Sequence, residues 1–202
     1  KTLTKTVKNI AGVKNVTPVI EGHVMATAKG VAQGAVIRAF YPKDLNKREM
    51  ISGNIKRGSI KFFGGKDGLI LGEKLAQKLG LKIGDRVNLI SPKGTISAFG
   101  TIPKMRSFKV IATVDIGMYE YDSSFIFMPM TAAKAYFRMK QTVTNLEVFI
   151  NNPANTKEMI SAISQKISAN FIIYDWQNAN AVFFNAIQVE RNVMFLILTL
   201  II

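Results

Sequence analysis

The chain has 202 residues, of which 48% are hydrophobic, and its 27 lysines and arginines against 13 acidic residues give a formal net charge of +14 at pH 7. A chain of this length forms one large domain or two small ones, and it has enough apolar residues for a packed core. Because it contains no cysteine, disulfide bonds, cysteine-ligated zinc and thiol catalysis are excluded.

The first 40 residues predict a helix followed by two strands. Apolar residues recur at helical spacing over Thr2–Ile10, and Gly12 suits the end of such a helix. The segment 13–28 is typical of an extended chain, Gly30 marks a turn, and 31–40 predicts the partner strand of a hairpin. The chain therefore opens as helix, strand, strand.

The middle of the chain predicts a loop-rich excursion and then a strand, a short helix and a second strand. Glycine, proline and charged residues interrupt any periodicity over 41–68. The segment 69–71 predicts a buried strand and 73–79 a helix with its leucines facing inward. Gly80 is expected to end that helix in the left-handed conformation that only glycine adopts at low cost. Alternating apolar residues at 87–89 predict the next strand.

The later segments complete an α+β pattern. Strands are predicted at 107–116 and 123–130, and a helix at 131–139 with Thr131 as its N-cap. Strand, helix and strand are then predicted at 146–150, 155–168 and 171–176. Together with the opening elements, these last three predict a small α+β sheet domain, and the middle of the chain is an inserted, β-rich second lobe.

The chain ends in an unbroken apolar run, Val193–Ile202, which a helix predicted over 175–191 would enter directly. One interpretation is a buried helix of a soluble protein. The other is the beginning of a membrane helix, of which the run supplies about half the required length of roughly 20 residues. We favour the second because the run has no polar face and no helix-ending glycine or proline.

Few residues indicate a catalytic, metal-binding or phosphate-binding site. His23, the only histidine, has no cluster of acids around it in the sequence, so a structural role is favoured over a triad or a metal site. Glu120 and Asp122 are expected to share one side of a strand, where they act as an acid–base pair or, as a simpler interpretation, form ion pairs or finish a turn. The GGKDG segment at 64–68 lacks the spacing of a phosphate-binding loop. We therefore predict no enzyme activity, no metal and no cofactor.

The segment SPKGTISAFGTIP, residues 91–103, has a different character. Its prolines restrict the backbone near both ends, its glycines permit sharp bends, and it carries apolar side chains at Ile96, Phe99 and Ile102. Large apolar side chains at a loop tip between two strands indicate recognition of a partner. The alternative is a loop that folds back over the protein's own apolar surface.

The positive charge indicates an anionic partner, such as a nucleic acid, an anionic membrane surface or an acidic protein, or else a solvated lysine-rich surface. The lysines are spread from Lys1 to Lys166 rather than clustered, and no Arg-rich helix or zinc finger is present. We therefore predict no nucleic-acid binding.

Four passages resemble the periplasmic domain of the LolC/LolE family, the membrane subunits of a bacterial lipoprotein-releasing ABC transporter. These are GVKNVTPVIEG (12–22), ILGEKLAQKLGLKIGDRV (70–87), the loop that closes with GTIP (100–103), and VERNVMFLILTLII (189–202). The second passage is also similar to text in MacB-like and FtsX-like transporters, whereas the loop resembles the "Hook" of LolC and is more discriminating.

The resemblance implies a MacB/LolC-like α+β fold with two lobes. A "Porter" lobe is expected from 1–40 and 141–185, an inserted β-rich "Sabre" lobe from 41–140, and the start of a truncated transmembrane helix from 186–202. It also implies a first membrane helix before Lys1.

The resemblance further implies that a protruding hairpin recruits a LolA-type lipoprotein chaperone in the periplasm, beside a "Pad" that adds contacts. Arg106 agrees with the Pad pattern, Asn88 and Met105 depart from it, and the loop is one residue shorter than the best-known form. Phe99 and then Ile96 are expected to enter the chaperone deepest. The implied protein-binding residues are Pro92, Lys93, Gly94, Thr95, Ile96, Ser97, Ala98, Phe99, Gly100, Thr101, Ile102, Pro103, Asn88, Met105 and Arg106.

Other partners follow from the same resemblance: a LolD-type subunit that hydrolyses ATP, a second LolC/LolE-type subunit, the lipoprotein substrate and the inner membrane. The chain resembles LolC, LolE or a hybrid of the two. The alternative is the periplasmic domain of a MacB-like efflux transporter or an FtsX-like regulatory transporter that binds another periplasmic partner.

Overall fold

The computed structural model describes residues 2–97, 100–140, 142–168, 171–179 and 181–201, and they divide into two compact units. One unit consists of 1–16 and 148–202, and the other of 17–147. This division differs from the predicted lobes, whose boundaries were 40/41 and 140/141. The difference arises because β1 (Val13–Ala28) is one continuous strand that leaves the first unit and enters the second. The lobe assignment by resemblance stays a prediction.

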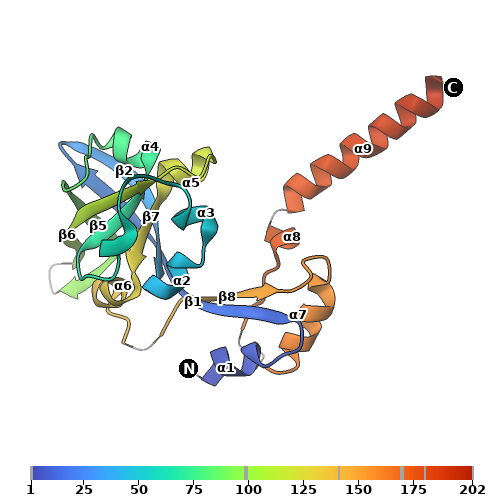
Figure 1. The fold of residues 1–202 in the computed structure, drawn as a ribbon, viewed down its shortest axis with the longest axis horizontal. Helices are drawn as coiled ribbons and strands as arrows, with labels where there is room; N and C mark the ends of the chain where they lie inside the picture. Colours follow the sequence, from blue (N-terminus) through green and yellow to red (C-terminus); the bar gives the residue numbers. More distant parts are fainter. Residues whose placement is uncertain (1, 98–99, 141, 169–170, 180, 202) are drawn as a thin grey trace. The chain divides into compact units, whose positions relative to one another are not determined.

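The larger unit, 17–147, holds most of the strands (Figure 1). After β1 its elements are β2 (Val31–Phe40), α2 (Pro42–Asn46), α3 (Glu49–Ser52), β3 (Ile55–Gly58), the 3₁₀ turn η1 (Ile60–Phe62), β4 (Gly68–Gly72), α4 (Glu73–Lys78), β5 (Arg86–Ser97), β6 (Gly100–Val114), α5 (Tyr119–Ser124), β7 (Phe125–Pro129) and α6 (Met130–Phe137). Helices and a mostly antiparallel sheet confirm the α+β class.

Six strands of this unit pair in a closed ring, in the order β1, β2, β7, β4, β6, β5 and back to β1. The ring closes because residues 25–27 of β1 pair with β2 on one side and with β5 on the other. Closure gives the backbone groups of these strands partners on both sides and removes the open edges that invite aggregation.

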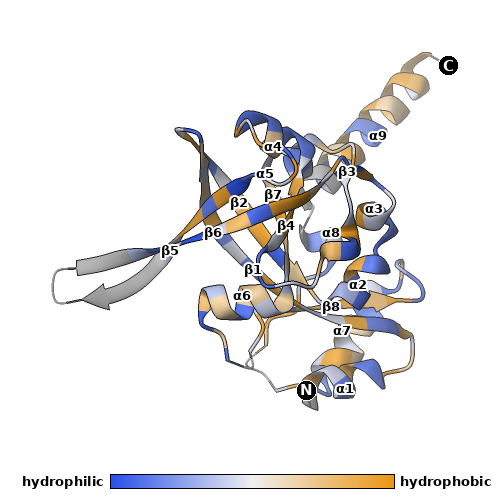
Figure 2. Cartoon of the chain, turned by 60° about the vertical axis from the view of Figure 1, so that its left-hand side comes forward, coloured by the Kyte–Doolittle hydropathy of each residue, from blue (hydrophilic) through white to orange (hydrophobic). Residues whose placement is uncertain are grey.

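Side chains point alternately to the two faces of each strand, so they form two separate apolar cores. On β4, Leu69 and Leu71 belong to one core and Ile70 to the other. All six ring strands contribute to the first core, which is therefore the inside of the ring, and α4 and α6 add side chains to it. The second core lies on the outer face, where Leu45 of α2 and Ile51 of α3 cover Phe40 and Phe127. Figure 2 shows hydrophobic residues concentrated in β4 and β7, as burial on both faces requires.

The sequence predictions of the β1–β2 hairpin and of the glycine after α4 are confirmed. The bounds of β1 and β2 match the predicted strands, and they pair as an antiparallel hairpin from Ile20↔Ala39 to Ala28↔Val31. Helix α4 ends before Gly80, whose φ of +63° is the left-handed conformation expected there.

The opening hairpin is joined to the middle of the chain, because β2 pairs in parallel with β7 over Val36↔Phe125 to Phe40↔Pro129. Two predictions in this unit are wrong. The excursion at 41–68 is not mainly loop, since it forms α2, α3, β3 and η1. The N-cap of α6 is Pro129 rather than Thr131, because the helix already begins at Met130.

The smaller unit consists of α1 (Thr2–Lys8), the first residues of β1, β8 (Asn145–Ile150) from Val148 onward, α7 (Thr156–Ser164), α8 (Trp176–Ala179) and α9 (Ala181–Ile201). Gly12 has a φ of +89°, and an added Cβ there would lie 2.7 Å from Met159 Cε of α7, so the turn after α1 requires glycine.

The strand predicted at 171–176 is wrong. Residues 171–175 have no regular structure, and Phe171, Ile172 and Tyr174 are exposed.

The predicted helix over 175–191 and the apolar run after it form α8 and α9, and α9 continues to Ile201. Within the described residues, no helix combines the length and apolarity needed to span a bilayer.

Candidate functional site

The hairpin of β5 and β6 contains the segment that the sequence analysis singled out. The two strands pair continuously from Arg86↔Lys109 to Ser91↔Lys104, and again from Thr95↔Ile102 to Ser97↔Gly100. Between these two stretches the register shifts, so that residues 92–94 of β5 oppose Pro103 alone. The bulge coincides with Pro92 and Pro103, which have no N–H to donate to the ladder.

Beyond this bulge the hairpin is a two-stranded ribbon. The pairing of β1 with β5 covers 88–90, and the pairing of β4 with β6 covers 109–114. Past Ser91 and Lys104, the described pairings join β5 and β6 only to each other. From Ser91 to Ser97 a strand rises by about 20 Å at roughly 3.3 Å per residue. Such a ribbon is a hairpin tip, as predicted. Ala98 and Phe99 lie outside the described residues.

The predicted Pad residues do not share one face. Ile90↔Met105 and Asn88↔Ser107 are opposite pairs on the outer face of the ring, whereas Leu89↔Arg106 lies on the inner face. Met105 is 62% exposed. Arg106 donates from Nη2 to Asp67 Oδ1 at 2.8 Å, and its guanidinium carbon lies 5.0 Å from the centre of the Phe108 ring. Arg106 is therefore already engaged within its own unit.

Met105 belongs to one of two rows of uncharged residues that sequence reasoning missed, and at their edge Arg86 Nε donates to Ser107 Oγ at 3.0 Å. Register aligns one row across four strands, Gly34, Met25, Ile90 and Met105, and a second row, Ala32, Thr27, Asn88 and Ser107. Met25 is 44% exposed, and a Cβ added to Gly34 would meet no atom within 4 Å. The sequence indicated only that Met25 lies on the opposite face of β1 from Val24 and Ala26, which are buried. The register of β1 with β5 was needed to place Met25 beside the hairpin.

Lys104 fixes the base of the hairpin. Its Nζ donates to the carbonyls of Ala135 at 3.0 Å and Tyr136 at 2.5 Å, in the last turn of α6, where a cation also suits the helix dipole. Burial, and then the nearby charges of Arg138 and Arg106, hold the pKa of Lys104 below its usual value. Because Ser91↔Lys104 is the last pair before the bulge, this contact ties the ribbon to the packed ring.

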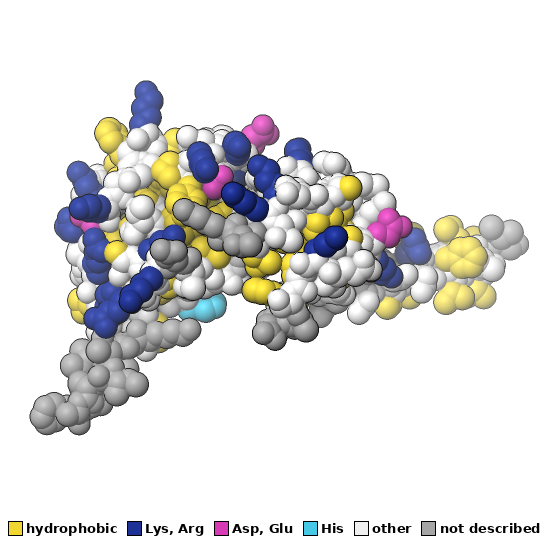
Figure 3. All heavy atoms as spheres, turned by 90° about the horizontal axis from the view of Figure 1, so that it is seen from below, with side chains coloured by type: hydrophobic (Ala, Val, Ile, Leu, Met, Phe, Trp, Pro, Cys, Tyr) yellow, Lys and Arg dark blue, Asp and Glu magenta, His cyan; other side chains and the backbone are white. Residues whose placement is uncertain are grey.

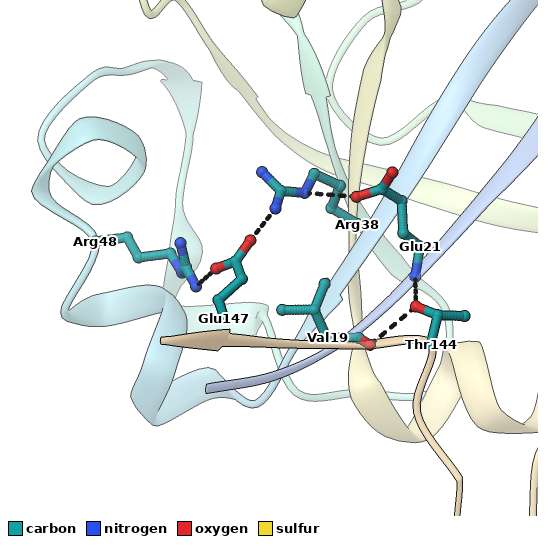
Figure 4. A network of polar contacts seen from close by, with 6 residues as sticks. All are labelled: Val19, Glu21, Arg38, Arg48, Thr144 and Glu147. Carbon is teal, nitrogen blue, oxygen red and sulfur yellow. Dashed lines mark hydrogen bonds and ion pairs between the residues drawn. The ribbon is translucent and has the colours of Figure 1, made fainter. Parts of the chain in front are cut away.

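A polar network secures the chain where it returns from α6 toward β8 (Figure 4). Arg38 and Arg48 both donate to the Glu147 carboxylate, and Arg38 Nε also pairs with Glu21 Oε2 at 3.3 Å. The Arg48 guanidinium lies 4.2 Å from the centre of the Phe40 ring. The two cations face two carboxylates, so the network is balanced in charge.

Thr144 completes this network through the backbone. Its N–H and its hydroxyl both donate to the Val19 carbonyl, at 3.1 and 3.0 Å, and its Oγ1 accepts from Glu21 N at 2.7 Å. The network therefore holds residues 144–147 against β1 and β2, which is a structural role.

The acidic residues considered for catalysis are not paired in a site. Glu120 and Asp122 lie on α5 rather than on a strand, and the buried Asp122 carboxylate accepts from Ile116 N at 2.8 Å and Gly117 N at 3.1 Å. Asp122 therefore finishes a turn, one of the two readings of the sequence.

Glu73 is held by structural hydrogen bonds, whereas His23 lies on the surface. Burial alone would raise the pKa of Glu73, but hydrogen bonds, including those from Arg57 and Gln77, and the charge of Arg57 lower it below its usual value. His23 is exposed on β1 (cyan in Figure 3). Across the described ranges, no group of three or more His, Asp or Glu residues could hold a metal ion.

Figure 3 also shows lysines and arginines scattered over the visible face rather than in one patch.

Comparison with known proteins gives a family match and relatives. Residues 2–166 match the family model described as the MacB-like periplasmic core domain. The chain is 27% identical over 206 residues to the lipoprotein-releasing system transmembrane protein LolC of Neisseria meningitidis, covering 100% of this chain and 49% of that protein. It is 30% identical to LolC of Haemophilus influenzae, covering 98% and 49%. The chain thus spans about half the length of these relatives.

Two solved structures share the fold. The extracellular domain of the noncanonic ABC-type transporter YknZ from Gram-positive bacteria has a TM-score of 0.56 at 16% identity, covering 82% of this chain and 80% of that chain. The periplasmic region of MacB from Actinobacillus actinomycetemcomitans has a TM-score of 0.54 at 15% identity, covering 91% and 82%. At these identities the likeness concerns the fold alone.

Proposed function

Because the chain belongs to the MacB-like periplasmic core domain family, we propose that it is the periplasmic domain of a lipoprotein-releasing ABC transporter subunit in the inner membrane. In this proposal the β5–β6 hairpin recruits a LolA-type chaperone. The domain holds that chaperone near the outgoing lipoprotein, and ATP hydrolysis in a separate LolD-type subunit drives release.

The single observation that carries the proposal is the two-stranded ribbon past Ser91 and Lys104. Because the described pairings give this ribbon no third strand, we infer that its residues serve to bind a partner rather than to extend the ring. An apolar anchor that enters a partner's pocket contributes about 2 kcal/mol or more to binding. The bulge and the prolines restrict the base of the ribbon, which lowers the entropy lost on docking.

The outer face beside the hairpin supports the same function. Met25 and Met105 are exposed there, in a chain whose net charge is +14. Flexible thioether side chains adapt to varied apolar surfaces. A chaperone held by the ribbon would rest on this face, while surrounding lysines steer its acidic surface during approach.

The proposed contact residues are those of the Hook-like segment, 92–103, together with Asn88, Met105 and Arg106. Met105 and Asn88 take part through the outer face. Arg106 takes part only at the edge of the contact, because Asp67 holds its guanidinium.

The remaining partners are proposed from the relatives named LolC: a second LolC/LolE-type subunit, the LolD-type ATPase, the lipoprotein and the membrane that α9 would enter. The Porter-like and Sabre-like lobes belong to this same proposal.

The fold likeness to MacB and YknZ favours a second candidate, the domain of an efflux or regulatory transporter that binds a different periplasmic partner. The hairpin discriminates between the two, because only the first candidate requires a chaperone to bind it.

A shortened hairpin tests the proposal. Since Ser91 and Lys104 are directly opposite each other, an Asn-Gly turn can replace residues 92–103 and close the ladder. We expect this variant to keep its melting temperature and to lose capture of a LolA-type chaperone. The matched control replaces Lys29–Gly30 of the β1–β2 turn with Asn-Gly, which keeps the length of that turn and leaves the β5–β6 hairpin intact. Capture by the shortened variant at the level of the unmodified chain would remove the hairpin from the mechanism.

A further inference from the structure

A cleft in the larger unit lies where two strands leave the same edge of β6. The pairing of β5 with β6 begins at Arg86↔Lys109, and the pairing of β3 with β6 ends at Gly58↔Ala112. Between them, Gly84 N donates to Val110 O at 2.8 Å and Ser59 N to Ile111 O at 3.2 Å. The cleft therefore has hydrogen-bonded walls, and its volume of about 490 Å³ is within the range of ligand sites.

The cleft is apolar and open. Phe62 of η1 is 71% exposed, Ile83 is 40% exposed, and Ile111 lies at the margin of the outer core. Glycine is required at position 58, where β3 meets β6 at the cleft, because its φ is +80° and an added Cβ would lie 2.1 Å from Ile111 O. Since Phe62 remains exposed, the cleft suits a side chain presented by a segment lying across it better than an enclosed small molecule.

Positive charge surrounds this apolar surface. Lys109 lines the cleft and forms no ion pair among the described residues. Asp67 also lines it, but Arg106 occupies that carboxylate. Three exposed lysines directly precede lining residues in the chain: Lys61, Lys66 and Lys82.

We infer that this cleft docks an acidic protein segment that carries one large apolar side chain. The apolar side chain packs against Phe62, Ile83 and Ile111, and the flanking carboxylates face Lys109 and the neighbouring lysines. The site is separate from the hairpin tip and does not depend on the chaperone proposal, because its residues come from the segment 58–68, the 82–85 turn and the far end of β6.

Fluorescence anisotropy tests this with the 202-residue chain and a fluorescein-labelled Glu-Glu-Phe-Glu-Glu peptide. We expect binding at low salt that weakens about tenfold when glycine replaces the peptide's phenylalanine. Phe62→Ser and Lys109→Glu should each weaken it about tenfold, which corresponds to about 1.4 kcal/mol. The matched control, Lys140→Glu, changes an exposed lysine that does not line the cleft and should leave the affinity within about twofold.

Three results would overturn the inference. The first is absence of binding at millimolar peptide. The second is equal loss in Lys140→Glu and Lys109→Glu, or equal binding of the glycine peptide, because either reports charge attraction alone. The third is displacement of the peptide by dodecanoate at lower concentration than by unlabelled peptide, which would assign the cleft to a lipid acid. Unchanged melting temperatures of the variants exclude unfolding as the cause of any loss.

Discussion

The two ends of the β5–β6 hairpin differ in what surrounds them. At the ring end, Val87, Leu89 and Phe108 are fully buried, and β1 and β4 flank the pair. At the tip end, past the bulge, the described pairings are between β5 and β6 only. One end of the hairpin is thus held by packing within the ring, whereas the other end pairs with no third strand among the described residues.

The transition between the two ends is built into the sequence. Pro92 and Pro103 interrupt the ladder, and Lys104 joins the last regular pair to α6. We therefore predict that substitutions on the ring side of the bulge lower stability and that those on the tip side weaken binding.

The largest expected effect is on the ring side. Phe108→Ala removes a fully buried ring that packs edge-on against Tyr136, and it should lower the free energy of unfolding by about 3–5 kcal/mol. Urea denaturation measures this loss. A cost below about 1 kcal/mol would show that the ring end is not the packed end.

On the tip side, Phe99→Ala should leave the free energy of unfolding unchanged within about 0.5 kcal/mol. It should weaken binding of a LolA-type chaperone by about 2 kcal/mol, or roughly thirtyfold, because the anchor is lost. Calorimetric titration measures the affinity. Tyr119→Ala, which truncates a 58% exposed aromatic residue on α5, is the control and should bind normally. Equal affinities for both variants would show that Phe99 does not anchor the chaperone.

Lys104, at the junction between the two ends of the hairpin, should affect both stability and chaperone binding, each to a smaller extent. Lys104→Met removes two hydrogen bonds to α6 and should cost about 1 kcal/mol of stability, with a few-fold loss of chaperone affinity because the base of the hairpin is less fixed. Thermal melts and titrations measure the two. Lys140→Met, which keeps that anchor, serves as the control. A stability loss with no change in affinity would separate the anchor from docking.

The smallest effect is expected on the outer face. Met105→Ala should weaken chaperone binding by less than about 1 kcal/mol and leave stability unchanged, since Met105 is 62% exposed. Met50→Ala, at a 56% exposed methionine on α3, is the matched control. If Arg106→Ala instead has the larger effect on binding, the chaperone contacts the inner edge rather than the outer face.

The sequence predicted those parts of the fold that depend on neighbouring residues. The β1–β2 hairpin and the glycine end of α4 follow from short-range patterns, and both are confirmed. The ring was not predicted, because its closure depends on pairings such as β2 with β7, between residues about 90 positions apart.

Two local errors have the same origin. Residues 171–176 have strong strand propensity, yet 171–175 pair with no strand in the described chain, because propensity does not supply a partner. Glu120 and Asp122 were placed on a strand, whereas backbone N–H groups of Ile116 and Gly117 draw the Asp122 carboxylate into a turn before α5.

For the candidate site, sequence reasoning placed the hairpin between two strands but not the faces of its base. Register alone separates Met105 from Arg106 and adds Met25 and Ile90 to the outer row.

The chain contains no cysteine, so one introduced thiol can report directly on docking. In Phe99→Cys labelled with an environment-sensitive fluorophore, we predict a blue shift on addition of a LolA-type chaperone, with no shift for the same label in Lys140→Cys. An unchanged emission at position 99, under conditions where the chaperone is bound, would contradict the claim that the hairpin tip is buried inside the partner.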